Sequence, residues 1–247
     1  MSILEFDAIK KSDCIIKKSF RQFLNQSDDY KNKFLQSNYN IAFDGYSFFG
    51  QTDSLNQYDT DMLYSFVISN FQPVERFPKE FHTFLSTHWL ELVEKIKEKE
   101  LQIIKKQNIP VLDLYQNDAI GYMMSCNYYP KPNNYKLTAK DNTRLSEHTD
   151  VSLFTTFPFG ISEGFSYSER NKQIRLGNKE KILVFNGYFS EFVTDGKVKA
   201  LNHQVELPKN LDSERFSFAI FSMPKPGCTF YIGKKKYSAS DYYNKYL

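Results

Sequence analysis

The chain has 247 residues, of which 41% are hydrophobic, 25% charged and 17% aromatic. This composition is that of a globular protein with a sizeable core, which excludes a largely disordered chain, and the length suits a single all-β domain. The net charge of +3 is spread along the chain, with Lys234 to Lys236 as the one dense basic run, so we expect no binding to nucleic acid.

The first residues and the cysteines bear on location. Residues 1–14 carry charges where a secretory signal needs an apolar core, and no apolar run reaches the length of a membrane span. The three cysteines, Cys14, Cys126 and Cys228, lie far apart, as expected of free thiols in a reducing compartment. We therefore expect a cytoplasmic protein with no membrane association.

Helical patterns dominate the first part of the chain. Residues 15–40 mix charged and apolar residues at helical spacing, and residues 79–106 do so more clearly, which predicts one long helix there. Between them, residues 46–64 are aromatic, contain glycine and show no period, which fits loops or short strands.

Strand patterns dominate after Pro110. Short runs rich in Phe, Tyr, Val, Thr and Ile are separated by proline and glycine, which is typical of a sandwich or barrel. We predict a mainly β fold with flanking α-helices, in one domain over residues 1–247. In this domain residues 1–108 form a mainly helical N-terminal part and residues 109–247 form the β core.

Of the four histidines, two fall in a pattern that suits a metal. His82 and His88 project from different faces of the predicted helix, so we assign both to surface or packing roles. His148 and Asp150 flank Thr149 in residues 147–155, which resemble a strand, and residues two apart on a strand share a face.

His203 lies in a second strand-like run, residues 201–207. Two histidines and one carboxylate on one face of an octahedron leave room for a bidentate cosubstrate and O₂ on ferrous iron. The same set also suits a hydrolytic zinc ion, so these residues alone leave both metals open.

A further strand-like run, residues 215–221, favours iron. Arg215 and Ser217 alternate onto one face, and Phe216 and Phe218 take the other. An arginine that faces the interior is costly unless it meets an anion, and its donors pair with a carboxylate in a bidentate manner. A dicarboxylate cosubstrate meets that need.

These motifs resemble the 2-oxoglutarate and Fe(II)-dependent dioxygenase superfamily, in particular the branch of isopenicillin N synthase and the plant flavonoid and gibberellin oxygenases. Asn-Tyr-Tyr-Pro at 127–130 and Asn-Gly at 186–187 add to the resemblance, which is close over residues 123–223. It departs from the family at Tyr188, usually an aspartate there, and at Gln204, usually an arginine.

The resemblance implies a double-stranded β-helix (jelly roll) core and a complete site. It places Fe(II) on His148, Asp150 and His203, and the distal carboxylate of 2-oxoglutarate on Arg215 and Ser217. It also implies that Tyr129 donates to the cosubstrate and that Asn127 helps to position it. Read singly, Tyr129 also suits strand-end packing, and Asn127 suits a turn.

The implied reaction uses O₂ and 2-oxoglutarate to oxidise an unactivated C–H bond, by hydroxylation, desaturation or cyclisation, and yields succinate and CO₂. The substrate would be a small molecule such as an amino acid or a specialised metabolite. Two alternatives remain: an Fe(II) oxidase of the isopenicillin N synthase type that does not use 2-oxoglutarate, and a non-catalytic jelly-roll binding protein. The sequence indicates neither the substrate nor the oligomeric state.

Other residues near these motifs have a more ordinary interpretation. We expect Arg144 to be a solvated loop charge rather than a contact to an acidic substrate. Four phenylalanines are expected in the core rather than around a substrate: Phe154, Phe157, Phe165 and Phe221.

Overall fold

The computed structural model describes residues 3–7, 13–39, 43–49, 61–135, 143–170 and 172–244. The helices are α1 (Asp13–Leu24), α2 (Asp28–Asn32), η1 (Gln36–Asn38), η2 (Val74–Arg76), α3 (Lys79–Thr87), α4 (Trp89–Gln107), α5 (Leu112–Gln116), η3 (Pro132–Asn134), α6 (Tyr188–Val193) and α7 (Ala239–Tyr243). The strands are β1 (Ile3–Phe6), β2 (Gly45–Ser47), β3 (Tyr64–Ser69), β4 (Ile120–Tyr129), β5 (Thr143–Thr149), β6 (Phe154–Phe157), β7 (Phe165–Glu169), β8 (Lys172–Arg175), β9 (Ile182–Asn186), β10 (Asn202–Glu206), β11 (Arg215–Pro224), β12 (Thr229–Ile232) and β13 (Lys235–Ser238).

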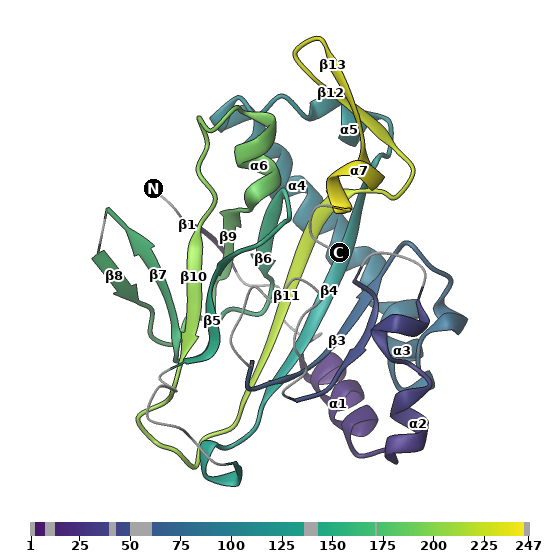
Figure 1. Ribbon diagram of the computed structural model, residues 1–247, viewed down its shortest axis with the longest axis vertical. Helices are drawn as coiled ribbons and strands as arrows, with labels where there is room; N and C mark the ends of the chain where they lie inside the picture. Colours follow the sequence, from purple (N-terminus) through teal and green to yellow (C-terminus); the bar gives the residue numbers. More distant parts are fainter. Residues whose placement is uncertain are drawn as a thin grey trace.

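Two antiparallel sheets form the core (Figure 1). The larger sheet has the strand order β1-β9-β6-β11-β4-β3-β2, and the smaller has the order β5-β10-β7-β8. Strands β12 and β13 form a separate hairpin. This is the mainly β, jelly-roll core that we expected, although the described strands do not close into a barrel.

Helices cover the outer face of the larger sheet. Helix α1 buries Phe20 and Phe23, and α3, beside it in Figure 1, buries Phe81. The rings of Phe23 and Phe81 each lie 4.9 Å from the ring of Phe66 on β3. Burial of each such ring contributes about 1.5–3 kcal/mol, which fixes the helices against the sheet and leaves its inner face for the site.

The long helix predicted over residues 79–106 is wrong in one respect, because it is two helices. His88 separates α3 from α4, with φ −123° and ψ −26°. Its N–H still bonds to the carbonyl of Phe84, and its own carbonyl accepts from Leu92. Apolar residues keep their helical spacing across this kink, so the pattern cannot reveal it.

The single strand predicted over residues 147–155 is also wrong, because β5 ends within it and β6 begins after a turn. At this turn the chain crosses from the smaller sheet to the larger one. The start of α6 holds the turn, since the N–H of Tyr188 bonds to the carbonyl of Asp150 at 2.6 Å. A Cβ atom on Gly187 would lie 2.2 Å from the carbonyl oxygen of Ser152, so only glycine fits there.

Two other expectations concern smaller segments. In residues 46–64 the chain forms part of β2 and the first residue of β3, while residues 50–60 lie outside the described residues. None of the described helices has both the length and the apolar character needed to cross a membrane.

Candidate metal and cosubstrate site

The three predicted metal ligands come together at the edge of the smaller sheet. Residues His148 on β5 and His203 on β10 are direct partners in the antiparallel register, and Asp150 follows β5 in the turn. The Nε2 atom of His148 lies 3.4 Å from Oδ1 of Asp150, and Nε2 of His203 lies 3.7 Å from Oδ2. One ligand atom from each residue lies within 4.8 Å of the others, and the described residues contain no other group of this kind.

Backbone carbonyls orient both imidazoles. The Nδ1 atom of His148 lies 2.7 Å from the carbonyl oxygen of Ser146, and Nδ1 of His203 lies 3.3 Å from that of Leu201. A carbonyl can only accept, so Nδ1 carries the proton and the Nε2 lone pair is available to a metal.

A hydroxyl orients the carboxylate. Thr155 Oγ1 donates to Oδ2 of Asp150 at 2.5 Å and also lies 2.9 Å from the hydroxyl of Ser152. Sequence reasoning missed this contact, because Thr155 lies on the next strand, β6, and its hydroxyl reaches Asp150 only after the turn between them has formed.

The protonation states of Asp150 and His203 suit metal binding. Although burial alone would raise it, the neighbouring histidines hold the pKa of Asp150 at about 2. Burial lowers the pKa of His203 to about 4. Burial opposes the charge on His148, but the hydrogen bond to Asp150, the negative charge of Asp150 and the carbonyl of Ser146 together outweigh burial and raise the His148 pKa. An ionised carboxylate and a neutral His203 are the forms that coordinate metals.

Arg215 is a buried cation with no counter-ion among the described residues. Arg215 is 4% exposed, and its Nε, Nη1 and Nη2 atoms have no hydrogen-bond partner among the described residues. Burial lowers the pKa of its guanidinium. A buried charge left unpaired costs several kcal/mol, so this arrangement is stable only if an anion occupies the space in front of it.

The other predicted cosubstrate residues lie beside Arg215 on the inner face of the larger sheet. In the pairing of β11 with β4, Arg215 is opposite Tyr129 and Ser217 is opposite Asn127. All four line one cavity together with the metal ligands. The Tyr129 ring is 1% exposed and its centroid lies 5.0 Å from Cζ of Arg215. Asn127 lies within β4, so the turn interpretation is wrong for it.

Arg144 is not the solvated loop charge that we expected. It is 2% exposed on β5, and its Nη2 atom donates to the carbonyl oxygens of Ser213, at 2.5 Å, and Pro130, at 3.2 Å. Ser213 comes just before β11, and Pro130 comes just after β4. Arg144 therefore ties together the strand ends that carry Arg215 and Tyr129.

Aromatic rings enclose the metal ligands. Phe154, Phe157 and Phe165 are buried in the core, as expected, but Phe157 and Phe165 also line the cavity together with Phe221. The Phe165 ring stacks 5.2 Å from His203, and Phe185 packs edge-on at 5.1 Å. Nothing in the sequence around Phe185 distinguishes it from a core residue.

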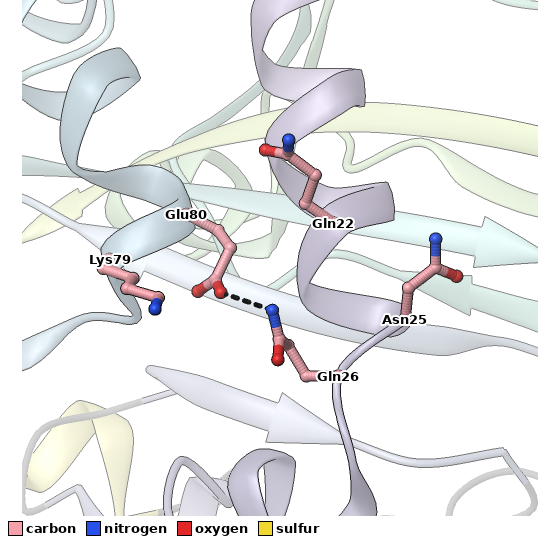
Figure 2. A pocket seen from close by; sticks show the side chains of 5 residues that line it. All are labelled: Gln22, Asn25, Gln26, Lys79 and Glu80. Carbon is pink, nitrogen blue, oxygen red and sulfur yellow. Dashed lines mark hydrogen bonds between the residues drawn. The ribbon is translucent and has the colours of Figure 1, made fainter.

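A second hollow lies on the outer surface between α1 and α3. It is lined by Gln22, Asn25, Gln26, Lys79 and Glu80, and Figure 2 shows the amide of Gln26 directed at the carboxylate of Glu80, 2.9 Å away. Its volume is about 510 Å³, but it shares no residue with the metal cavity. We assign it no part in the site.

Comparison with known families matches residues 120–224 to the model of the 2OG-Fe(II) oxygenase superfamily. This segment is a 2OG-Fe(II) oxygenase domain. It covers less than half of the chain but contains all the candidate metal and cosubstrate residues. This domain assigns non-heme iron and 2-oxoglutarate chemistry to this part of the chain, while the predicted branch within the superfamily stays a prediction. None of the curated proteins matches the sequence.

Solved structures support the fold of the oxygenase domain. A full-length Neurospora crassa protein in complex with alpha-KG (2-oxoglutarate) superposes with a TM-score of 0.73 at 17% identity, covering 98% of this chain and 85% of that one. The dioxygenase for auxin oxidation in rice superposes with a TM-score of 0.69 at 13% identity, and the match covers 99% of this chain and 85% of that one. JOX2, in complex with 2OG, Fe and JA, superposes with a TM-score of 0.67 at 16% identity, and the match covers 99% of this chain and 77% of that one.

Proposed function

We propose that His148, Asp150 and His203 bind Fe(II), and that Arg215 and Ser217 bind the distal carboxylate of 2-oxoglutarate. The observation that carries this proposal is the buried guanidinium of Arg215. Its three nitrogens have no hydrogen-bond partner among the described residues, and it lines a cavity shared with the histidine and aspartate ligands. A dicarboxylate that reaches from the metal to Arg215 would satisfy both ends of the cavity.

Tyr129 and Asn127 complete the proposed cosubstrate site. Their register opposite Arg215 and Ser217 places them on the same inner face, where a phenol and an amide can donate to the cosubstrate. The close packing of Tyr129 against Arg215 also restricts the rotamers of the guanidinium, so less entropy is lost when the anion binds.

We propose that the reaction is oxidation of an unactivated C–H bond in a small molecule, by hydroxylation, desaturation or cyclisation, with release of succinate and CO₂. When bound, the iron supplies O₂ activation, and the protein's own residues orient cosubstrate and substrate around it. The named ligands of the similar structures favour a small substrate, since the Neurospora protein was also crystallised with thymine and JOX2 with JA.

We also propose that the chain is a single domain. Strands β1 and β3, from the part predicted to be mainly helical, pair with β9 and β4 of the β core. One cluster of buried side chains contains residues from α1, near the start, and from α7, near the end.

The test is anaerobic titration of the protein with Fe(II) and 2-oxoglutarate, with the weak visible charge-transfer band as the readout. We expect the band in the wild type and at least a tenfold loss of 2-oxoglutarate affinity in Arg215→Met, because hydrogen bonds to a charged group contribute about 1.5–3 kcal/mol each. Arg175→Met, at an arginine side chain that is 78% exposed, is the matched control and should bind like the wild type.

The runner-up is an oxidase that takes all its electrons from the substrate. A measurement of whether O₂ consumption requires 2-oxoglutarate separates the two, because such an oxidase would consume O₂ with its substrate in the absence of 2-oxoglutarate. Absence of the band in the wild type, or unchanged 2-oxoglutarate binding in Arg215→Met, would contradict the proposed function.

A further inference from the structure

A second cavity opens directly beside the metal ligands. Its volume is about 210 Å³, and it shares Asp150 and Phe221 with the cavity of the cosubstrate residues. This volume equals the share of roughly seven water molecules in the liquid, which is small for a ligand pocket. A molecule held there would lie against the metal ligand Asp150.

One wall of this cavity belongs to a row of polar side chains, Ser217, Asn127, Ser65 and Ser47, which begins in the cosubstrate site and is called the polar row below. The antiparallel register aligns Ser217 with Asn127, Asn127 with Ser65, and Ser65 with Ser47, across β11, β4, β3 and β2. Residues directly opposite one another project to the same face, so the row runs from the cosubstrate cavity into the second one. The Ser47 hydroxyl donates to Oε1 of Gln36 at 3.4 Å, and the Gln36 amide keeps two N–H donors of its own.

The remaining walls are apolar. Val67, Met123 and Met223 come from β3, β4 and β11 of the same inner face, and Phe221 is the direct partner of Met123 in the register. Two methionines give the walls flexible, polarisable surfaces that adapt to the shape of an apolar group.

The described residues that line this cavity include no cationic side chain. Among the described residues that line it, Asp150 is the one ionisable group, and the metal takes its carboxylate. The two buried arginines, Arg215 and Arg144, do not line it. The carboxylates of Asp150 and 2-oxoglutarate already balance the charge of a bound Fe(II). An anionic substrate would therefore lose its hydration without meeting a cationic side chain among the described residues, at a cost of several kcal/mol.

We propose that this cavity is the substrate site and that it takes a small, uncharged molecule with a largely apolar body and one hydrogen-bonding edge. The hydrogen-bonding edge faces Ser47 and Ser65 of the polar row, and the apolar body lies against Val67, Met123 and Phe221. This inference rests on the proposed function, because it uses Asp150 as a metal ligand.

The test measures binding of two matched pairs of probes to the full chain by ligand-detected NMR, with Fe(II) and 2-oxoglutarate present under nitrogen. The pairs are 4-methylphenol with 4-hydroxybenzoate, and pentanamide with pentanoate. We expect each neutral member to bind at least tenfold more tightly than its anionic partner. Equal or tighter binding of the anions, or no binding of either neutral probe, would overturn the inference.

Variants locate the binding. Val67→Phe fills the cavity and should weaken the neutral probes at least tenfold, whereas Leu90→Phe, at a residue that is 72% exposed, adds the same ring elsewhere and should change nothing. Ser47→Lys places a cation at the polar wall and should shift the preference toward the anions at least tenfold. Neutral binding that survives Val67→Phe, or an unchanged preference in Ser47→Lys, would show that the probes bind elsewhere.

The Fe(II) and 2-oxoglutarate charge-transfer band keeps the two hypotheses separate. Loss of the band in the wild type would contradict the proposed function itself. A normal band together with anion-preferring probes would contradict only the assignment of the substrate class.

Discussion

At the scale of single residues, hydrogen bonds rather than the metal ligands alone define the candidate site. In both histidine ligands, His148 and His203, the Nδ1 atom bonds to a backbone carbonyl, and Asp150 accepts a hydrogen bond from the hydroxyl of Thr155. These partners fix the direction of each ligand before a metal arrives, so less entropy is lost on binding.

Thr155→Val should weaken metal binding. It removes the donor to Asp150 without a large change of shape, and loss of such a partner costs about 10–100-fold in metal affinity. Competition titration with a chromophoric chelator measures the effect. Thr156→Val is the control, because Thr156 is also buried but its hydroxyl has no partner among the described residues. Equal affinities of the two variants would refute the role of Thr155.

At the scale of elements, buried polar side chains join strands and helices at two places. Arg144 of β5 bonds to the chain beside β4 and β11, next to the cosubstrate residues. Glu100 of α4 accepts hydrogen bonds from Tyr115 of α5, at 2.8 Å, and from Tyr122 of β4, at 2.9 Å. Each is costly to bury, so each makes the packing of its elements specific.

Arg144→Met should lower the affinity for 2-oxoglutarate more than the affinity for Fe(II). The bonds of Arg144 hold the ends of β4 and β11, where Tyr129 and Arg215 lie, whereas the metal ligands have other partners. We expect the KM for 2-oxoglutarate to rise several-fold with kcat nearly kept, and Arg144→Lys to restore part of it. A fall in kcat at unchanged KM would contradict this positioning role.

Glu100 makes stability depend on pH. Burial raises its pKa from 4.5 to about 7, so the folded state favours the protonated carboxyl. Because the pKa is raised in the folded state, the contribution of Glu100 to the free energy of unfolding is fully present below about pH 4.5. It is lost as the pH rises through 7. The loss amounts to roughly 3 kcal/mol at most.

Glu100→Gln should remove this loss. In urea unfolding between pH 5 and pH 8, we expect the wild type to lose stability relative to Glu100→Gln as the pH rises. Glu98→Gln, at an exposed position of the same helix, should follow the wild type. If the difference between wild type and Glu100→Gln stayed constant with pH, the carboxyl would not titrate in this range.

At the scale of the whole molecule, the site joins the two sheets. His148 and His203 belong to the smaller sheet, Arg215 and Ser217 belong to the larger one, and Asp150 lies where the chain crosses between them. A metal and a cosubstrate bound together would bridge both sheets, so their binding should stabilise the fold as a whole.

Thermal unfolding tests this bridge. Fe(II) with 2-oxoglutarate under nitrogen should raise the Tm, since ligand at a hundredfold excess over its Kd adds about 2.7 kcal/mol. A chelator should reverse the shift. Arg215→Met should keep the increment from the metal and lose most of that from 2-oxoglutarate, whereas Asp150→Ala should lose both. A shift of the wild-type size in Asp150→Ala would place the metal elsewhere.

The sequence by itself determined the types and order of the site residues and the fold class. The pairs His148 with Asp150, and Arg215 with Ser217, are local patterns, because residues two apart share a face on an extended chain. The mainly β fold followed in the same way from short apolar runs between turns. For the metal pair, the geometry came from a strand end and a turn rather than from one continuous strand.

Only the tertiary structure decided which distant residues join these pairs. Thr155, Arg144 and Phe185 act through contacts that form after the sheets pair, and no spacing along the chain encodes such contacts. The same holds for the cavity beside Asp150, whose polar row depends on the register of four strands. Register and burial depend on the whole fold, so they lie beyond what a local pattern can specify.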